Sequence, residues 1–328
     1  MRVLYNCFQR YRRYGLAVAA IFIGISAHAQ KEVQFSQFYH NQLFFNPATA
    51  GKEAQTRIGV VYRSQYAGYQ PANNLDKGGS PTSQLLTASI PFGKFGVGFY
   101  ALNDKIGALT QQDVQLGASY KVSLPRGSLA VGARAGVYRQ SMDYDQLRPE
   151  DPNIDDPLFQ NGVVSEIKPD LSIGLHYESD VFYAGASATH LTKPSYKLGS
   201  AEATNPLVTN YYINAGAFIS LGYMLEVQPL VLAKMVPGAI SAEGGALVTF
   251  DQRFFGGLTY RNQDAIAIIH AGAYLMEDRS LRISGAYDIV MRGDKAKTPT
   301  SFEVMLSYAF GAQKNTQKSI IRTPRFRF

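Results

Sequence analysis

Apolar side chains alternate with polar or small ones in one segment after another of this sequence, and no apolar run is long enough for a membrane helix. Between Leu171 and Glu178, every second residue is Leu, Ile or Tyr, and Ser, Gly, His and Glu stand between them. Successive side chains of a strand point to opposite faces, so each such segment has one apolar and one polar face. Fourteen segments show the pattern, near residues 57–63, 82–91, 94–102, 112–123, 128–139, 169–178, 181–190, 210–220, 223–234, 241–250, 253–261, 265–275, 280–290 and 301–310.

The connections between these segments alternate in length. Every second one is short, as at 91–93, 124–127, 178–180, 221–222, 251–252 and 276–279. The others are mostly long, at 64–81, 103–111, 140–168, 191–209 and 291–300, with two short exceptions at 235–239 and 262–264. Short periplasmic turns and long extracellular loops are typical of outer-membrane barrels. The pattern places both ends of the mature chain on the short-turn, periplasmic side.

Composition favours a membrane barrel over a soluble all-β protein. Only 17% of residues are charged, while the chain holds 30 Gly, 21 Tyr and 19 Phe. Strands can cross hydrocarbon only in a closed sheet, where every backbone group has a partner. The predicted fold is therefore all-β: a transmembrane antiparallel up-and-down β-barrel of about fourteen strands. Tyrosines near strand ends would form interfacial girdles, namely Tyr62, Tyr100, Tyr120, Tyr177, Tyr260, Tyr274 and Tyr308.

The two ends of the chain differ from its body. Residues 1–29 have the basic, apolar and small-residue regions of a signal peptide, which predicts cleavage between Ala29 and Gln30 and removal of the single cysteine, Cys7. We expect an N-terminal periplasmic or plug segment at 30–56, an outer-membrane barrel at 57–310 and a basic periplasmic tail at 311–328. The net charge of +7 lies in the two ends, so the high pI does not indicate nucleic-acid binding.

The segment after the predicted cleavage site is aromatic and does not alternate, and it carries a specific pattern. Its characteristic residues are Gln34, Phe35, Ser36, Gln37, Asn46, Pro47 and Gly51. This segment resembles the opening signature of the PorP/SprF family of type IX secretion and gliding-motility outer-membrane proteins of Bacteroidetes. The likeness continues through 62–68, 183–191, 255–261 and 302–310. One departure is Tyr66, where the family pattern has tryptophan.

The resemblance implies a function that the alternation does not show. It implies an accessory component of the type IX secretion system in the outer membrane of a Gram-negative bacterium, in contact with outer-membrane lipid. Such a barrel would bind, export or anchor cargo proteins with a C-terminal sorting domain. It would also contact periplasmic ring and lipoprotein components of the machine. The alternative is an outer-membrane channel for small-solute uptake, which an open lumen would favour and a plugged one would oppose.

Catalytic patterns are sparse, and we predict no enzymatic activity and no cofactor. The sequence has no G-x-S-x-G elbow, no H-E-x-x-H and no phosphate-binding glycine loop. Ser172 and His176 share a strand face but lie two alternations apart, too far for a direct bond. We interpret His176 and His190 as lumen or rim residues. A surface enzyme that depends on either remains the third hypothesis.

An acidic loop precedes residue 168 and is a candidate partner- or calcium-binding site. Its candidate residues are Asp143, Asp145, Asp151, Asn153, Asp155 and Asp156. The spacing from Asp151 to Asp155 matches the start of a calcium loop, but Asp156 stands where the turn needs glycine and Gly162 where a bidentate glutamate belongs. A solvated acidic loop and a docking surface for a basic partner are the other interpretations.

The tail is the second candidate contact surface. It mixes cations with aromatic residues in Arg322, Arg325, Phe326, Arg327 and Phe328. A soluble, frayed terminus is one interpretation. A periplasmic contact with the secretion machine is the one we favour.

Overall fold

A computed structural model describes residues 32–68, 79–147, 162–198, 204–291 and 300–310, and all structural statements below concern these ranges. The strands are β1 (Thr56–Ser64), β2 (Thr82–Phe92), β3 (Phe95–Ile106), β4 (Leu109–Leu124), β5 (Gly127–Asp143), β6 (Val163–Glu178), β7 (Phe182–Thr189), β8 (Ser195–Lys197), β9 (Thr204–Pro206), β10 (Asn210–Ala217), β11 (Ile219–Leu221), β12 (Leu225–Val236), β13 (Ala239–Phe250), β14 (Phe254–Arg261), β15 (Ile266–Leu275), β16 (Leu281–Val290) and β17 (Thr300–Phe310). Short helical turns are α2 (Gln42–Phe45), η1 (Pro47–Thr49), η2 (Tyr144–Gln146) and η3 (Gln263–Ala265). No helix in these ranges is both long and apolar enough to cross a membrane.

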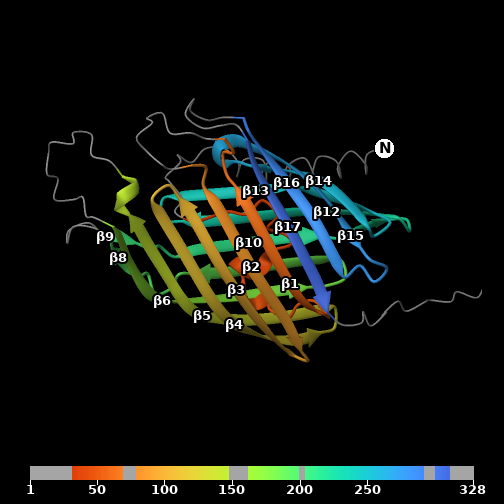
Figure 1. Cartoon of the computed structure of the whole chain (residues 1–328). Helices are drawn as coiled ribbons and strands as arrows, with labels where there is room; N and C mark the ends of the chain where they lie inside the picture. The colour runs from red at the N-terminus through yellow and green to blue at the C-terminus, as the bar shows by residue number, and fades with distance from the viewer. Residues whose placement is uncertain (1–31, 69–78, 148–161, 199–203, 292–299, 311–328) are drawn as a thin grey trace, which may run out of the picture.

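The large sheet closes on itself. Each strand pairs antiparallel with its neighbour in sequence, β10 pairs with β7 and β12, and β1 pairs with β17 from Thr56↔Phe310 to Ser64↔Phe302 (Figure 1). β11 continues the line of β10 after a break at Phe218, and both pair with β12. Counted as one interrupted strand, they give a closed barrel of fourteen strands, which confirms the predicted fold class. β8 and β9 form a separate hairpin.

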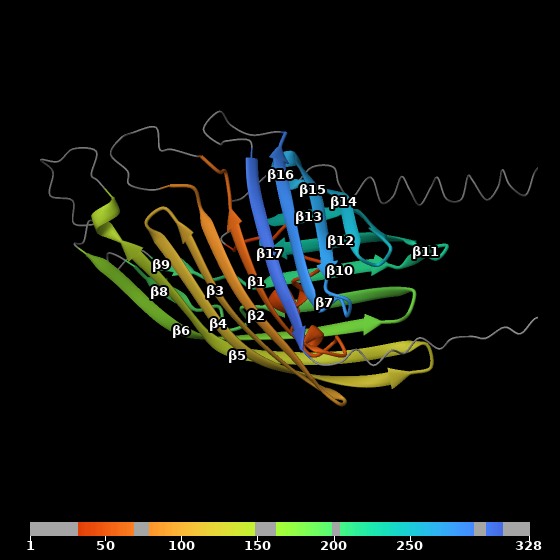
Figure 2. The same cartoon turned by 45° about the vertical axis from the view of Figure 1, so that its right-hand side comes forward.

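The two ends of the barrel differ as the connections predict, with one correction. Figure 2 shows the tight turns between β2 and β3, between β4 and β5 and between β6 and β7 at one end of the barrel. The strand ends that the longer connections join lie at the opposite end. The expected long loop at 103–111 is wrong, because β3 and β4 are joined by Gly107 and Ala108 alone. Strand pairing continues through polar residues in that region, where the Gln112 side chain donates to Asn103 Oδ1 at 3.1 Å. The polar residues of this region therefore belong to a hairpin that extends beyond the apolar band of the barrel, and not to a loop.

The two faces of the wall have opposite character. Outward positions carry large exposed apolar side chains on nearly every strand of the ring, such as Leu116, Ile173 and Leu258. Inward positions are buried and mostly polar or charged. Outside-apolar and inside-polar alternation is what a lipid-facing barrel requires. Of the predicted girdle tyrosines, Tyr62, Tyr120, Tyr260 and Tyr308 are exposed and Tyr177 is half-buried. The prediction is wrong for Tyr100, which is 2% exposed and points inward, and for Tyr274, which lines a cavity of the lumen.

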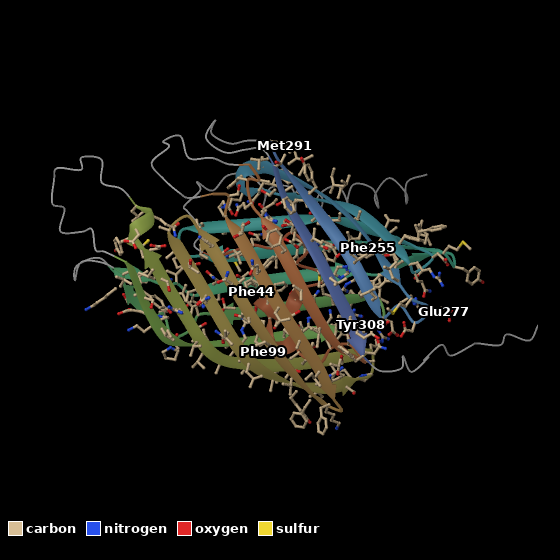
Figure 3. The ribbon with its side chains drawn as sticks, viewed as in Figure 1. Phe44, Phe99, Phe255, Glu277, Met291 and Tyr308 are labelled. Carbon is tan, nitrogen blue, oxygen red and sulfur yellow. The ribbon has the colours of Figure 1, made fainter. Side chains whose placement is uncertain are left out.

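Residues 32–55, which we call the plug, run through the lumen. Their aromatic side chains Phe35, Phe38, Phe44 and Phe45 form one buried cluster with wall residues that include Tyr100 and Tyr212. Figure 3 labels Phe44 inside the barrel, between Met291 at the long-loop end and Glu277 at the short-turn end. The ends of the plug lie at opposite ends of the barrel, since Glu32 contacts Asn210 and Lys234 near the long loops, whereas β1 begins at the short turns. Entry of this segment from the periplasmic side, as the loop pattern suggested, is not what the structure shows.

Glycines of the wall make room for the backbone and the side chains of the plug. A Cβ on Gly132 of β5 would lie 2.5 Å from Ala48 N and Pro47 C, and one on Gly174 of β6 would lie 2.1 Å from Asn46 Oδ1. Both distances are far below an ordinary contact, so only glycine fits without a shift of the plug. The sequence of the wall is thus matched to the presence of the plug.

We expect Gly132→Ala to destabilise the plugged barrel, because overpacking against backbone atoms costs about 1–3 kcal/mol. The matched control is Gly244→Ala, where the nearest atom to an added Cβ is 3.5 Å away. Thermal unfolding in detergent, followed by the loss of heat-modifiable gel migration, should show a lower midpoint for the first variant only. Equal midpoints for both variants would contradict tight packing between plug and wall.

Candidate functional site: the plugged lumen

The signature residues of the N-terminal segment hold the plug in the lumen. Ser36 lies at the centre of one contact region, where its Oγ donates to Asp288 Oδ1 at 2.8 Å and accepts from Arg63 Nη1 at 2.8 Å. The backbone amides of Ser36 and Gln37 donate to the two carboxylate oxygens of Glu303 at 2.8 and 3.0 Å. A carboxylate that accepts hydrogen bonds from two successive backbone amides fixes both the position and the direction of the plug at that point.

The wall around Ser36 carries a buried cluster of charges, which we call the Ser36 cluster. Arg63 pairs with Asp288 at 2.7 Å and with Glu303 at 3.4 Å. Arg261 pairs with Glu243 at 2.6 Å and lies 3.8 Å from Asp288. All five side chains are at most 5% exposed. Buried charges are tolerated when every partner is present, and removal of one leaves the others uncompensated.

A second cluster, the Glu32 cluster, holds the other end of the plug. The Glu32 carboxylate accepts from Tyr212 at 2.6 Å and from Asn210, and it lies 3.4 Å from Lys234 Nζ. His190 bridges Glu32 at 3.2 Å and Asp170 at 2.7 Å. This end of the plug is therefore bound to β10, to β12 and to His190, the residue that follows β7, and through His190 to Asp170 of β6.

The charges of the Glu32 cluster reinforce one another. Burial opposes the ionised form of Glu32, but Lys234 and His190 outweigh it and hold the pKa of Glu32 well below its usual range. Burial likewise opposes the charged form of His190, but the Glu32 and Asp170 carboxylates outweigh it and raise the pKa of His190 to about 10. Ionised Glu32 therefore stabilises the folded protein at every pH above the pKa that a glutamate has in the unfolded chain. Protonated His190 also stabilises the folded protein, and this stabilisation is lost as the pH rises through about 10. The cluster is thus intact at neutral pH.

Asn46, Pro47 and Gly51 shape the turn of the plug. The Asn46 side chain accepts from Ala48 N at 3.0 Å and donates to Leu175 O of the wall at 2.9 Å, while Pro47 opens the short helix η1. Gly51 has a φ of +61°, which favours glycine, and an added Cβ would lie 2.6 Å from Gly96 Cα. These signature residues therefore serve one purpose, the fit of the plug to the wall.

Other predicted site residues lie elsewhere or outside the described ranges. Asp143 accepts from Asp145 N at 3.2 Å, and Asp145 accepts from Gly162 N at 2.9 Å, so the two close the neck of the acidic loop. No group of three or more His, Cys, Asp or Glu side chains suited to a metal occurs in the described part of the chain. Outside the described residues lie Ala29, Gln30, Asp151, Asn153, Asp155, Asp156, Arg322, Arg325, Phe326, Arg327 and Phe328.

The buried charges of the wall are the residues that sequence analysis did not select. Arg63, Lys234, Glu243, Asp288 and Glu303 all stand on polar faces of predicted strands. The sequence pattern that could have identified them is a charged residue at an inward-facing position of a strand. A water-filled lumen would also have charged residues at such positions, so the pattern alone does not reveal a plug. Only the plug contacts distinguish the two situations.

Comparison with known structures shows barrels of outer-membrane channels. The chain resembles "CymD monoaromatic hydrocarbon channel" with a TM-score of 0.50 and 13% identity over 88% of this chain and 95% of that one. It also aligns with the Pseudomonas putida toluene transporter TodX, with a TM-score of 0.47 and 10% identity over 87% and 96% of the two chains. A Pseudomonas aeruginosa FadL homologue gives a TM-score of 0.42 and 12% identity over 81% and 93%. At such identities the likeness concerns the fold.

Comparison by sequence identifies the family. No curated protein matches the chain. The family model described as "Type IX secretion system membrane protein PorP/SprF" matches residues 27–308, which include the plug and nearly the whole barrel. The chain therefore belongs to the PorP/SprF family and is an outer-membrane β-barrel component of the type IX secretion system.

Proposed function

We propose that this barrel binds secreted cargo with a C-terminal sorting domain at its long-loop end and exports or anchors it at the cell surface. Its short-turn end then contacts the periplasmic ring and lipoprotein components of the machine. Membership of the PorP/SprF family supports the connection with cargo and machine. The plugged lumen supports a role as an anchor.

The plug is the observation that carries this proposal. A polypeptide could pass through the lumen only if residues 32–55 left it. Departure of Ser36 and Gln37 would deprive Glu303 and Asp288 of three hydrogen bonds. Departure of Glu32 would leave Lys234 buried, with no other acidic partner in the described ranges. Breaking such buried interactions is strongly unfavourable, so we infer that cargo stays outside the lumen.

A channel for small solutes is the second candidate, and one observation favours it. The fold resembles that of the monoaromatic hydrocarbon channel CymD, with a TM-score of 0.50. Against it, the lumen at the Ser36 cluster is filled by charged side chains and plug backbone. An apolar solute would find charged, hydrogen-bonded groups there. Conductance decides between the two candidates.

We also propose that the chain is not an enzyme. His190 is held between two carboxylates, and His176 contacts Glu178 at 3.2 Å. Neither imidazole ring has a hydroxyl group as a hydrogen-bond partner in the described residues, and Ser172 Oγ has no partner there. A surface hydrolase activity that disappears on mutation of His176 or His190 would contradict this part of the proposal.

We expect the wild-type protein to show no ion conductance in planar bilayers and the Arg63→Ala variant to show conductance. Loss of Arg63 leaves Asp288 and Glu303 short of their partner, which destabilises the plugged state by about 3–5 kcal/mol. The control is Arg139→Ala, which removes the same charge from a side chain near the long loops that, among the described residues, contacts Gln112 and Ser165. Stable conductance by the wild type would favour the solute channel.

We expect native protein pulled down from outer membranes to bring with it both a large cargo protein and periplasmic components of the machine. Deletion of residues 314–328 should remove the periplasmic components and abolish cargo export, because this deletion takes away the cationic and aromatic residues of the tail. Heat-modifiable migration checks that the barrel still folds. Export that continues unchanged would show that the tail is not the contact, and absence of both cargo and machine would contradict the proposed function.

A further inference from the structure

A cavity of about 190 Å³ lies in the short-turn half of the lumen, on the periplasmic side of the plug. Residues of the plug and of the wall line it together. Those that matter here are His40, Asn41, Lys52, Arg57, Tyr274 and Arg282. The volume is several times that of a water molecule, whose share of liquid volume is about 30 Å³. An acidic side chain or a small organic acid fits such a space.

Arg282 of β16 is the unusual residue of this cavity. It is 4% exposed, and its Nη1 contacts His40 Nδ1 at 2.9 Å. Its Nε and Nη2 have no hydrogen bond within 3.5 Å in the described residues, and no acidic group there lies within 4.0 Å, although the Tyr274 hydroxyl and the Glu53 carboxylate of the same cavity lie near enough to interact with the guanidinium. Arg63 and Arg261, buried to the same degree, each have two acidic groups beside them. A buried guanidinium without a counter-ion requires an explanation.

The atoms left free on Arg282 have the geometry of a receptor for two oxygens. Nε and Nη2 form one edge of the guanidinium plane, and such an edge binds both oxygens of a carboxylate. Phosphate can bind the same edge, but the neighbouring amide of Asn41 favours a carboxylate that belongs to a peptide. The cavity therefore presents a donor pair suited to a carboxylate.

The neighbours of Arg282 add to this receptor. Asn41 is 2% exposed, and both its side-chain nitrogen and its oxygen lack a partner in the described residues. Lys52 Nζ donates to Gln42 Oε1 at 2.9 Å and has no ion pair in the same ranges. Arg57 is already paired with Glu53 at 2.5 Å. The cavity thus has two uncompensated cations and an amide that can bond to a peptide group.

The cavity has a route to the periplasm. A second cavity of about 560 Å³ shares Arg57, Phe218, Gln228 and Tyr274 with the first. Its other lining residues include the turn from Gly222 to Leu225 and the turn residues Gln252 and Arg279. These turns form the short-turn end of the barrel, which faces the periplasm. A ligand would therefore enter from that side.

We propose that Arg282, Asn41 and Lys52 form a binding site for a carboxylate presented from the periplasm. The carboxylate belongs either to a free organic acid or to an acidic residue or C-terminus of a polypeptide. The unpartnered amide of Asn41 suits the polypeptide, since it can donate to and accept from one peptide unit. The site depends on lumen geometry alone and is independent of where cargo binds.

The test uses the full-length protein purified in detergent and titrated in a calorimeter. The ligands are succinate, a tetrapeptide ending in two glutamates, and the same peptide with glutamines and an amidated end. We expect saturable binding of an acid and none of the amidated peptide. Arg282→Gln should weaken binding at least tenfold. Arg253→Gln, which removes an equal charge from an exposed turn at the same end, should change it less than twofold.

Each result either supports or overturns the proposed carboxylate site. Binding of the acidic peptide alone supports a polypeptide ligand, and equal binding of succinate supports a free acid. Absence of saturable binding to the folded wild type, or equal weakening by Arg282→Gln and Arg253→Gln, overturns the proposal. If Arg282→Gln does not fold, Lys52→Gln takes its place, with an expected loss of at least threefold. Unchanged binding in that folded variant likewise overturns it.

Discussion

The pairing of β1 with β17 is the constraint on which the rest of the structure depends. Within the described ranges it gives each strand of the wall two neighbours, except the short β11, which pairs only with β12, so the backbone groups of the wall find their partners within the sheet. Closure also divides the side chains into an outer set that meets lipid and an inner set that does not. The inner set includes Arg63 and Glu303, which lie directly opposite each other across this seam. The seam that closes the wall therefore also carries the charges that bind the plug.

The inner charges make the plug a structural necessity rather than an addition. In an open, water-filled lumen, Asp288 and Glu303 would be solvated. Here they are at most 1% exposed, and Ser36 and Gln37 supply the donors that water would otherwise supply. Gly132 and Gly174 complete this match, since the first admits the plug backbone and the second admits the Asn46 side chain. Wall and plug therefore specify each other, although the plug lies outside the barrel strands.

Much of this fold could be predicted from alternation, and the failures have physical causes. The fourteen strands followed because lipid contact imposes an apolar side chain at every second position. The hairpin at Gly107 was missed because strands continue beyond the lipid, where no apolar signal remains. Tyr100 was assigned to the surface because an aromatic residue suits both a girdle and a plug contact. The direction of the plug depends on contacts such as that between Glu32 and Lys234. These residues are 202 positions apart in the sequence, and no local pattern encodes such a contact.

The two ends of the plug differ in how their charges are satisfied, and this difference bears on mechanism. Toward the long loops, Glu32, Lys234, His190 and Asp170 compensate one another within the protein. Toward the short turns, Arg282 and Lys52 have no acidic partner in the described ranges, although Arg282 is equally buried. A carboxylate bound as proposed would contact Arg282 of the wall together with Asn41 and Lys52 of the plug, so its binding energy would stabilise the plugged state. A periplasmic carboxylate would then hold the lumen shut, which couples attachment at the periplasmic end to closure of the barrel.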